Sequence, residues 1–161
     1  GIQRSSATPW GAWTTTTPVQ HFKTRPKKDI MMIMAAHKIP YAATASVAYP
    51  DDFIAKVLKA KSLRGTRFIH IYSPCPPGWK VPSDISIHLA RLAVESRAFP
   101  LYEIEDGERY TLNRKPAGIP VADYLKLQGR FRHLTEEQMR TIQERVDADW
   151  ERLMHRIKYC L

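Results

Sequence analysis

The sequence lacks any apolar run long enough to cross a membrane. The longest, over residues 30–36, ends at His37 and Lys38, whereas a spanning helix needs about 20 residues. The first residues also lack the basic and apolar segments of a secretory signal, so we expect a cytoplasmic protein with no membrane partner. Cysteine is scarce, and Cys75 and Cys160 lie too far apart in the sequence to indicate a disulfide framework.

Acidic residues are also in short supply. The 161 residues contain 16 Asp and Glu against 25 Lys and Arg, a net charge of +9, and such an excess invites a nucleic-acid or polyanion ligand. The basic residues are scattered, however, in a small cluster at 23–28 and a diffuse one at 130–158. A solvated face or a subunit interface, with no nucleic-acid partner, explains this scatter better. The alternative is a non-catalytic module that binds single-stranded nucleic acid through its Arg-rich tail and Trp10, Trp13 and Trp79.

Familiar catalytic motifs are missing. The sequence contains no nucleophile elbow, no P-loop and no dinucleotide-binding glycine motif. Its six histidines are dispersed, and none lies at ligand spacing from a carboxylate or a thiol. The acidic residues at 103–106 indicate a turn rather than an acid–base pair. The residues alone therefore identify no catalytic side chain.

The hydrophobic pattern that is present alternates helices with strands. It predicts helices over 30–37, with Asp29 as the N-cap, over 52–63 and over 84–97, and strands over 41–48 and 66–72. Single helices between strands are typical of an α/β fold with parallel strands. Because two parallel strands alone do not make a stable sheet, we expect further strands before the first residue. The sequence thus reads as part of a larger protein.

The second part of the chain has a different character. Residues 101–105 and 109–112, joined by Asp106 and Gly107, predict a β-hairpin. The tail after residue 120 is predicted to be helical. A capping box at Thr135 predicts the start of its long final helix, and the helix carries one apolar stripe.

Two segments differ from ordinary core and surface patterns. Residues 1–18 offer hydroxyls, backbone N–H groups and Arg4, which suit a phosphate or carboxylate, although a hydroxyl-rich linker fits equally well. Residues 72–79 place Cys75 between prolines at the C-terminal end of a predicted parallel strand, where α/β folds bind ligands. A thiolate there suits a metal or an iron–sulfur cluster, whereas spacing alone favours a buried, inert thiol.

These segments resemble a known family, the β subunits of the 2-oxoacid:ferredoxin oxidoreductases, and within it pyruvate synthase. The matching stretches are GIQRSSATPWGAWTTTTP at 1–18, KKDIMMIMAAHKIPYAATASVAYPDDF at 27–53, FIHIYSPCPPGW at 68–79 and HLARLAVESRAFPLYEIEDGERYTLN at 88–113. They correspond to the C-terminal half of that subunit. The resemblance implies an α/β fold in which residues 1–118 form half of a doubly wound, parallel, thiamine-pyrophosphate-binding sheet. Residues 119–161 would form a mostly helical C-terminal tail.

The resemblance also implies an enzyme. In that family the subunit binds thiamine pyrophosphate with Mg²⁺ and supplies ligands to a [4Fe–4S] cluster. Pyruvate, coenzyme A and oxidised ferredoxin become acetyl-CoA, CO₂ and reduced ferredoxin, and the cofactor carries the difficult chemistry. Other subunits and ferredoxin are the implied partners, and a basic surface suits an acidic ferredoxin. Some members use other 2-oxo acids, but the opening loop most resembles the pyruvate branch.

Individual site residues follow from the same resemblance. Cys75 falls where the family has the last of its cluster cysteines, which reverses the inert-thiol interpretation. Gly1, Gln3, Ser5 and Ser6 follow directly after the family's cofactor motif, so we expect them to line the cofactor or substrate side of the loop. No catalytic residue is expected on this chain, which alone should be inactive.

Overall fold

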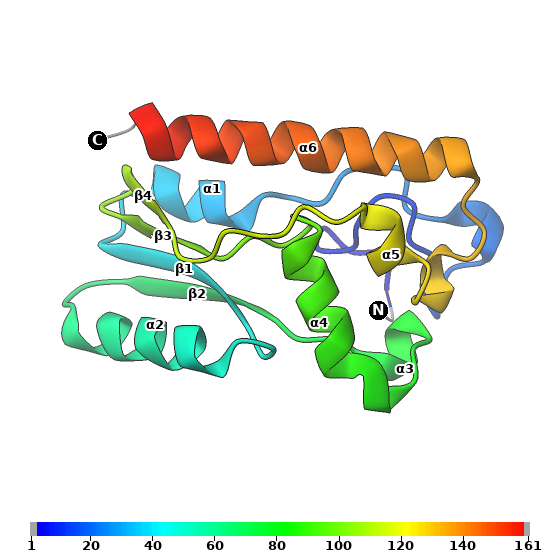
Figure 1. Cartoon of the computed structure of the whole chain (residues 1–161), viewed down its shortest axis with the longest axis horizontal. Helices are drawn as coiled ribbons and strands as arrows, with labels where there is room; N and C mark the ends of the chain where they lie inside the picture. The colour runs from blue at the N-terminus through cyan, green and yellow to red at the C-terminus, as the bar shows by residue number, and fades with distance from the viewer. Residues whose placement is uncertain (1–2, 160–161) are drawn as a thin grey trace.

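A mixed four-stranded sheet organises the chain (Figure 1). The computed structural model describes residues 3–159. The strands lie in the order β2-β1-β3-β4, with β1 at Tyr41–Ser46, β2 at Arg67–Tyr72, β3 at Tyr102–Glu105 and β4 at Arg109–Leu112. β1 and β2 are parallel, as predicted, and β3 and β4 form the predicted hairpin, antiparallel to β1. The α/β class is confirmed, and the hairpin extends the parallel pair into a wider sheet.

Helices account for most of the remaining regular structure in the described residues. The α-helices are α1 (Ile30–Ala36), α2 (Pro50–Ser62), α3 (Pro76–Trp79), α4 (Ser86–Glu95), α5 (Val121–Leu125) and α6 (Glu136–Tyr159), and the 3-10 turns are η1 (Val19–His21), η2 (Ser83–Ile85) and η3 (Gly129–Phe131). The helical C-terminal tail is confirmed. The segment expected to be a stiff loop contains the single turn α3, because prolines are tolerated at the first positions of a helix.

β1 is buried at every position because helices cover both faces of the sheet at this strand. Ala42 packs in a cluster with residues of α1 and α6, whereas Tyr41 and Ala43 pack against Ala60 of α2. Figure 1 shows the same arrangement, with α6 and α1 on one side of the sheet and α2 on the other. The short apolar run of β1 is typical of a strand enclosed on both faces.

Side-chain caps fix the starts of two helices that the sequence predicted. The Asp29 carboxylate accepts a hydrogen bond from the Met32 amide (3.1 Å) at the start of α1. At α6, the Thr135 amide donates to Gln138 Oε1 (3.0 Å), and the Gln138 amide donates to Thr135 Oγ1 (3.2 Å). This reciprocal pair is a capping box, so both predicted caps are confirmed.

The turn of the hairpin requires a glycine. Asp106 and Gly107 have φ angles of 52° and 75°, the left-handed pair that a tight hairpin turn needs. A Cβ atom at Gly107 would also lie 2.4 Å from the Ala35 carbonyl oxygen at the end of α1. The turn is therefore pressed against α1, and this contact helps to dock the hairpin on the helical layer.

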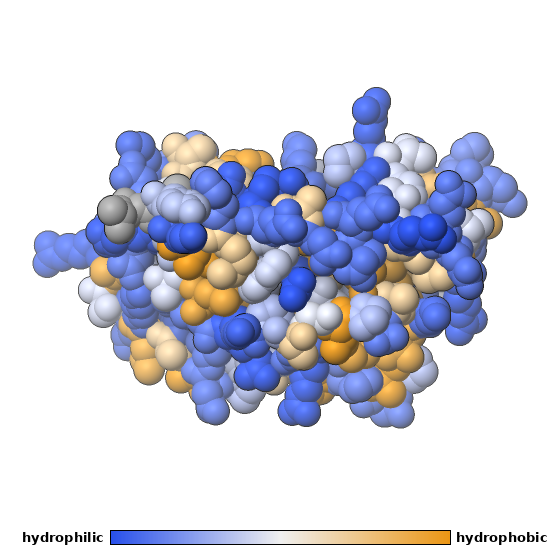
Figure 2. Space-filling view, turned by 45° about the horizontal axis from the view of Figure 1, so that its top comes forward, coloured by the Kyte–Doolittle hydropathy of each residue, from blue (hydrophilic) through white to orange (hydrophobic). Residues whose placement is uncertain are grey.

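A second core joins the tail to the rest of the molecule. It is centred on Leu89 and Val94 of α4, which pack with Val121 and Leu125 of α5. Side chains of α6 lie on this cluster as well as on the cluster over the sheet. Figure 2, which turns the α6 side of the molecule forward, shows mainly hydrophilic residues on this face. α6 therefore exposes a mainly polar face to the solvent and packs one apolar stripe against the two cores.

β2 forms one edge of the sheet. Within residues 3–159 its only strand partner is β1, and Ile71 on this strand is 44% exposed. An edge strand presents a row of backbone N–H and C=O groups that another strand can pair with. None of the helices in the described residues is both long and apolar enough to cross a membrane.

Candidate functional site

The turn that carries Cys75 lies at the C-terminal end of β2. Cys75 is exposed and occupies the N-cap position of α3. The Trp79 amide donates to the Cys75 carbonyl (2.9 Å), and the Val81 amide donates to the Pro76 carbonyl (3.1 Å). These bonds close the turn on both sides, so the cysteine is presented at the surface by a fixed backbone.

A buried arginine lies against this turn. The Arg130 guanidinium carbon is 3.9 Å from the centre of the Trp79 ring, although only 5% of Arg130 is exposed. Arg130 Nε donates to Gln128 Oε1 (2.9 Å), and Gln128 Nε2 donates to the Tyr124 carbonyl (2.9 Å). The side chain of Arg130 is therefore held both by an aromatic face and by a buried amide.

The polar side chains bonded to Arg130 are neutral. The hydroxyls of Tyr72 and Tyr124 share a hydrogen bond of 2.7 Å near the guanidinium. Burial lowers the pKa of Arg130, whereas Tyr124, Tyr72 and Cys75 act in the opposite direction. Among the described residues no carboxylate forms an ion pair with Arg130. The charge next to the Cys75 turn is therefore uncompensated within the described part of the chain.

A second cation contributes to the same field. Desolvation lowers the pKa of Lys27, Asp29 opposes this shift, and the charge of Arg130 lowers the pKa further. The Lys27 ammonium lies 5.7 Å from the centre of the Phe99 ring. The region between the turn and the sheet thus combines two positive charges that repel one another.

The opening loop is tied together by buried side chains. The Thr8 hydroxyl donates to the Gln3 carbonyl (3.0 Å) and accepts from the Ser5 amide (3.1 Å). Lys23, only 7% exposed, donates from Nζ to the carbonyls of Ser5 (2.6 Å) and Thr8 (3.1 Å). The Lys28 amide donates to the Ser6 carbonyl (3.0 Å). This network fixes the loop backbone.

Three of the four loop residues expected at the cofactor can be placed. Gln3, Ser5 and Ser6 are exposed in the same loop, and their side chains are accessible to a ligand. Gly1 lies outside the described residues. The loop therefore brings three of the expected residues together, and buried Lys23 holds its backbone through the Ser5 carbonyl.

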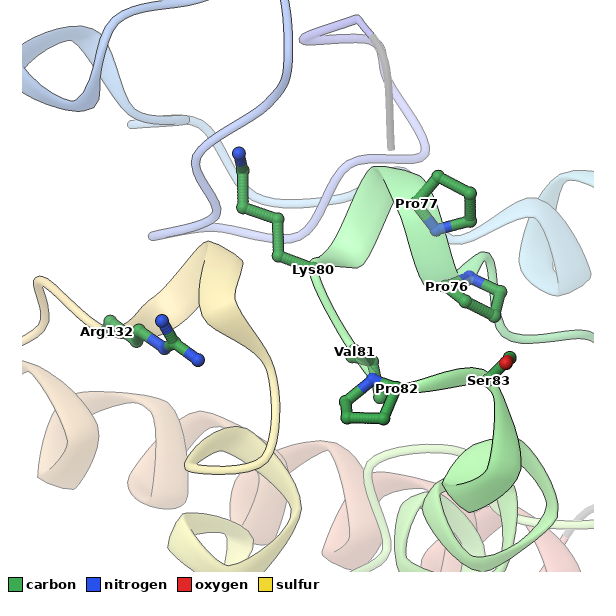
Figure 3. Close-up of a pocket in the computed structure, with 7 residues that line it drawn as sticks. All are labelled: Pro76, Pro77, Lys80, Val81, Pro82, Ser83 and Arg132. Atoms are coloured by element: carbon green, nitrogen blue, oxygen red, sulfur yellow. The ribbon is translucent and has the colours of Figure 1, made fainter.

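The opening loop and the Cys75 turn meet through one tryptophan. The Trp13 amide donates to the Arg130 carbonyl (2.9 Å), and the Lys80 ammonium lies 4.1 Å from the centre of the Trp13 ring. Figure 3 shows Lys80 extending from the turn after α3 toward the N-terminal segment. The two segments that the sequence singled out are thus linked in space.

A shallow depression of about 660 Å³ adjoins the Cys75 turn (Figure 3). Its lining residues are Pro76, Pro77, Lys80, Val81, Pro82, Ser83 and Arg132. A second hollow of about 590 Å³ lies between α6 and the sheet, and its lining includes Lys27, His70 and Trp150. Burial, reinforced by Lys27, lowers the pKa of His70 to about 4, so this histidine is neutral at pH 7.

Cations cover all the tryptophans. The pairs, with the distance from the charged group to the ring centre, are Trp10–Arg145 (4.8 Å), Trp13–Lys80 (4.1 Å), Trp79–Arg130 (3.9 Å) and Trp150–Arg97 (5.2 Å). A cation over an aromatic face is attracted by the ring quadrupole. Part of the basic excess therefore has an aromatic partner within the chain.

The described residues do not complete a metal site. No group of three or more His, Cys, Asp or Glu residues between positions 3 and 159 could hold a metal ion.

The sequence did not identify Gln128 and Arg130 as residues of the site, because Arg130 reads as one member of a diffuse basic cluster. The one local signal is Gly129, where a Cβ would lie 2.6 Å from Lys80 Cβ, so that the η3 segment can approach the Cys75 turn closely.

Comparison with known proteins identifies relatives along nearly the whole chain. The chain is 52% identical over 159 residues to ketoisovalerate oxidoreductase subunit VorB of Pyrococcus furiosus, which covers 95% of the chain and 51% of the relative. It is 53% identical over 151 residues to pyruvate synthase subunit PorB of Methanocaldococcus jannaschii, with 91% and 50% covered. It is also 41% identical over 174 residues to PorB of Pyrococcus horikoshii, with 94% and 53% covered.

The chain spans about half the length of the curated relatives it matches. No protein-family model matches it. Each relative is named as a subunit of an oxidoreductase or synthase, and none of these names supports the nucleic-acid-binding alternative. At 52–53% identity over more than nine-tenths of its residues, the chain belongs to the β-subunit family of the 2-oxoacid:ferredoxin oxidoreductases.

Proposed function

We propose that this chain forms the C-terminal half of a β subunit in an enzyme that oxidises a 2-oxo acid. Pyruvate, coenzyme A and oxidised ferredoxin would give acetyl-CoA, CO₂ and reduced ferredoxin. The observation that carries the proposal is Cys75, exposed on a fixed turn at the C-terminal end of a parallel strand. α/β folds bind ligands at this end of the strands, and the surroundings of Cys75 carry uncompensated positive charge.

The residues present fit the expected groups in part. An iron–sulfur cluster held by thiolates is anionic, and Cys75 lies beside a buried cation with no carboxylate partner. We assign Cys75 as one ligand of a [4Fe–4S] cluster, with the other ligands outside the described residues. When bound, thiamine pyrophosphate with Mg²⁺ supplies an electron sink for decarboxylation, and the cluster supplies one-electron transfer.

The opening loop would hold part of the thiamine pyrophosphate. Gln3, Ser5 and Ser6 offer amide and hydroxyl groups at the surface, and we add Gly1 because it follows directly after the family's cofactor motif. Lys23 holds the carbonyls of this loop from the buried side, so the exposed groups keep a fixed spacing. Such preorganised polar groups bind a ligand with little further loss of conformational freedom.

The larger assembly follows from the same assignment. Residues 1–118 would be half of the thiamine-pyrophosphate-binding domain, and residues 119–161 the tail that covers it. The open edge of β2 offers a place for a further strand. Other subunits of the complex and ferredoxin would be the partners, and the basic side chains of Lys80 and Arg132 at the depression suit an acidic protein.

An anaerobic purification tests this function. A tagged copy of the chain, expressed in its native source, is used to recover the intact complex, which is assayed for coenzyme-A-dependent reduction of methyl viologen. Pyruvate and ketoisovalerate are compared, because relatives named for each are equally similar to the chain. We expect activity with pyruvate and a brown, iron-containing eluate.

Cysteine variants of the tagged chain sharpen the result. Cys75→Ser should remove activity and one cluster's worth of iron, whereas Cys160→Ser, at the chain's other cysteine, should leave both unchanged. A colourless, inactive eluate without partner subunits would contradict the proposed function. So would a Cys75→Ser complex with full iron content and full activity.

A further inference from the structure

Arg130 is a buried cation whose compensating anion is absent from residues 3–159. We propose that Arg130 sets the reduction potential of the iron–sulfur cluster bound through Cys75, by stabilising the reduced cluster electrostatically. This inference rests on the proposed function and assigns a specific role to a residue that no sequence motif marks. Its basis is the position, the immobility and the missing counter-ion of Arg130.

The position of Arg130 is fixed relative to Cys75 by a single helical turn. Cys75 caps α3 and Trp79 ends it, and the Trp79 amide donates to the Cys75 carbonyl (2.9 Å). The Arg130 guanidinium stacks on the Trp79 ring at 3.9 Å, and Cys75 lies within its electrostatic range. A cluster attached to Cys75 would therefore lie near a permanent positive charge.

The guanidinium is held in place from two directions. Its Nε bonds to Gln128, which is fully buried and is itself bonded to the Tyr124 carbonyl. On the backbone, the Arg130 carbonyl accepts from the Trp13 amide of the opening loop. Because these contacts stop the charge from swinging out into solvent, water screens it much less than it screens an exposed arginine.

Lys56, another buried cation, has an acidic partner that Arg130 lacks. Lys56, 1% exposed, donates to the Asp52 carboxylate at 2.7 Å and to the Thr44 carbonyl at 2.8 Å. Lys23 donates only to two neutral loop carbonyls. A buried charge without an opposite charge is costly, and Arg130 has no carboxylate around it while the charge of Lys27 repels it. An anionic group bound beside it would remove this cost.

The direction of the effect follows from Coulomb's law. A cluster held by cysteine thiolates carries negative charge in both redox states and gains one further negative charge on reduction. A nearby cation therefore stabilises the reduced state more than the oxidised state. Removing the charge of Arg130 should make the cluster harder to reduce, which shifts its potential to more negative values.

The test is a potentiometric titration of the anaerobically purified complex, followed by electron paramagnetic resonance. The signal that disappears in Cys75→Ser identifies the cluster to be followed. Arg130→Gln and Arg130→Met both remove the charge, one with a polar and one with an apolar side chain that can still lie on Trp79. We expect each to favour the oxidised cluster about tenfold, a shift of about 59 mV for one electron.

Two further variants separate charge from structure. Arg130→Lys keeps a positive charge and should hold the potential close to that of the unsubstituted complex. Arg140→Gln removes the same charge from an exposed position on α6, and we expect less than a twofold change. Thermal unfolding of each complex shows whether a variant has only lost stability, which would not by itself move the potential.

The outcomes distinguish this inference from the function on which it rests. A more negative potential in both charge-free variants, restored in Arg130→Lys, supports the inference. An unchanged potential with the cluster signal intact overturns it and leaves the proposed function standing. If Cys75→Ser removes no signal, the proposed function fails and the inference falls with it.

Discussion

Lys56 and Arg130 are both almost completely buried, but only the charge of Lys56 has an acidic partner nearby. Beneath α2, the Lys56 ammonium binds the Asp52 carboxylate and the Thr44 carbonyl. Beside the Cys75 turn, the Arg130 guanidinium binds a neutral amide and two aromatic faces. The first charge is compensated by an acidic residue of the same helix, and the second has no such partner among the described residues.

The region beneath α2 compensates its other charges too. The Tyr41 hydroxyl donates to Glu103 Oε1 (2.5 Å), Lys59 Nζ donates to Glu103 Oε2 (3.2 Å), and Lys59 also pairs with Glu105. Burial would raise the pKa of Glu103, but hydrogen bonds from Tyr41, Asn113 and Lys59 hold it below its usual value. The charges beneath α2 are therefore compensated within the chain, whereas the charge of Arg130 is left open where a ligand is expected.

The largest expected effect is on Lys56. Lys56→Met leaves the Asp52 carboxylate and the Thr44 carbonyl without their donor, and it should lower the free energy of unfolding by about 3 kcal/mol. Lys61→Met, at an exposed position on the same helix, is the matched control and should cost about 0.5 kcal/mol or less. Urea unfolding followed by circular dichroism measures both. Equal losses for the two variants would show that the buried ion pair adds nothing.

His70 probes the other region, where positive charge is uncompensated. Its folded-state pKa of about 4 lies below the unfolded value of 6.5, so the unfolded chain binds more protons between these values. Stability is therefore complete above about pH 6.5 and is lost as the pH falls toward 4, by about 2 kcal/mol after allowance for partial exposure.

His70→Phe keeps a ring against Phe99 and should flatten most of this pH dependence. His133, whose pKa is also lowered by burial, would contribute to what remains, together with the carboxylates of Glu95, Glu103 and Glu105 near pH 4, because the pKa of each is held below its usual value. The measurement is the midpoint of urea unfolding at pH 7, 6, 5 and 4. A pH profile identical in the variant and the unsubstituted chain would contradict the assignment to His70.

Tyr41→Phe tests the compensated network with a smaller change. Glu103 loses the hydroxyl that supports its ionised form, and we expect a cost of about 1–2 kcal/mol at pH 7. The pKa of Glu103 should rise, so acid unfolding should begin at a higher pH than in the unsubstituted chain. Tyr159→Phe, at a residue that is 59% exposed, serves as the control and should be neutral in thermal unfolding.

The smallest expected effect is at Arg130 in the isolated chain. Arg130→Met removes the attraction to Trp79 and leaves the Gln128 oxygen without a donor, but it also removes an uncompensated buried charge. These contributions oppose each other, so unfolding should change by about 1 kcal/mol or less, far below the cost at Lys56. A loss as large as that of Lys56→Met would mean that both cations are simply structural.

Local signals predicted much of the fold but little of the site. The caps at Asp29 and Thr135 and the turn at Gly107 were readable because each depends on neighbours within a few residues. The parallel pair followed from the alternation of helices and strands. Arg130 was not readable, because its contact with Trp79 joins segments about 50 residues apart, and no periodicity encodes such a contact.

The predicted role of Cys75 came from a resemblance rather than from spacing, since spacing alone favours a buried, inert thiol, whereas the structure exposes Cys75. The structure adds the fixed turn and the cation beside it, which spacing could not provide. The residues Gln3, Ser5 and Ser6 are accessible in one loop, and their assignment to a cofactor stays a prediction.

The cations that cover the tryptophans also make the chain its own optical reporter. Indole emission responds to charge near the ring, and the four tryptophans sit beneath Arg145, Lys80, Arg130 and Arg97 at the opening loop, the Cys75 turn and α6. A ligand or subunit that draws one of these cations away would change the fluorescence of the tryptophan beneath it. Assembly of the proposed complex would thus be visible without any added label.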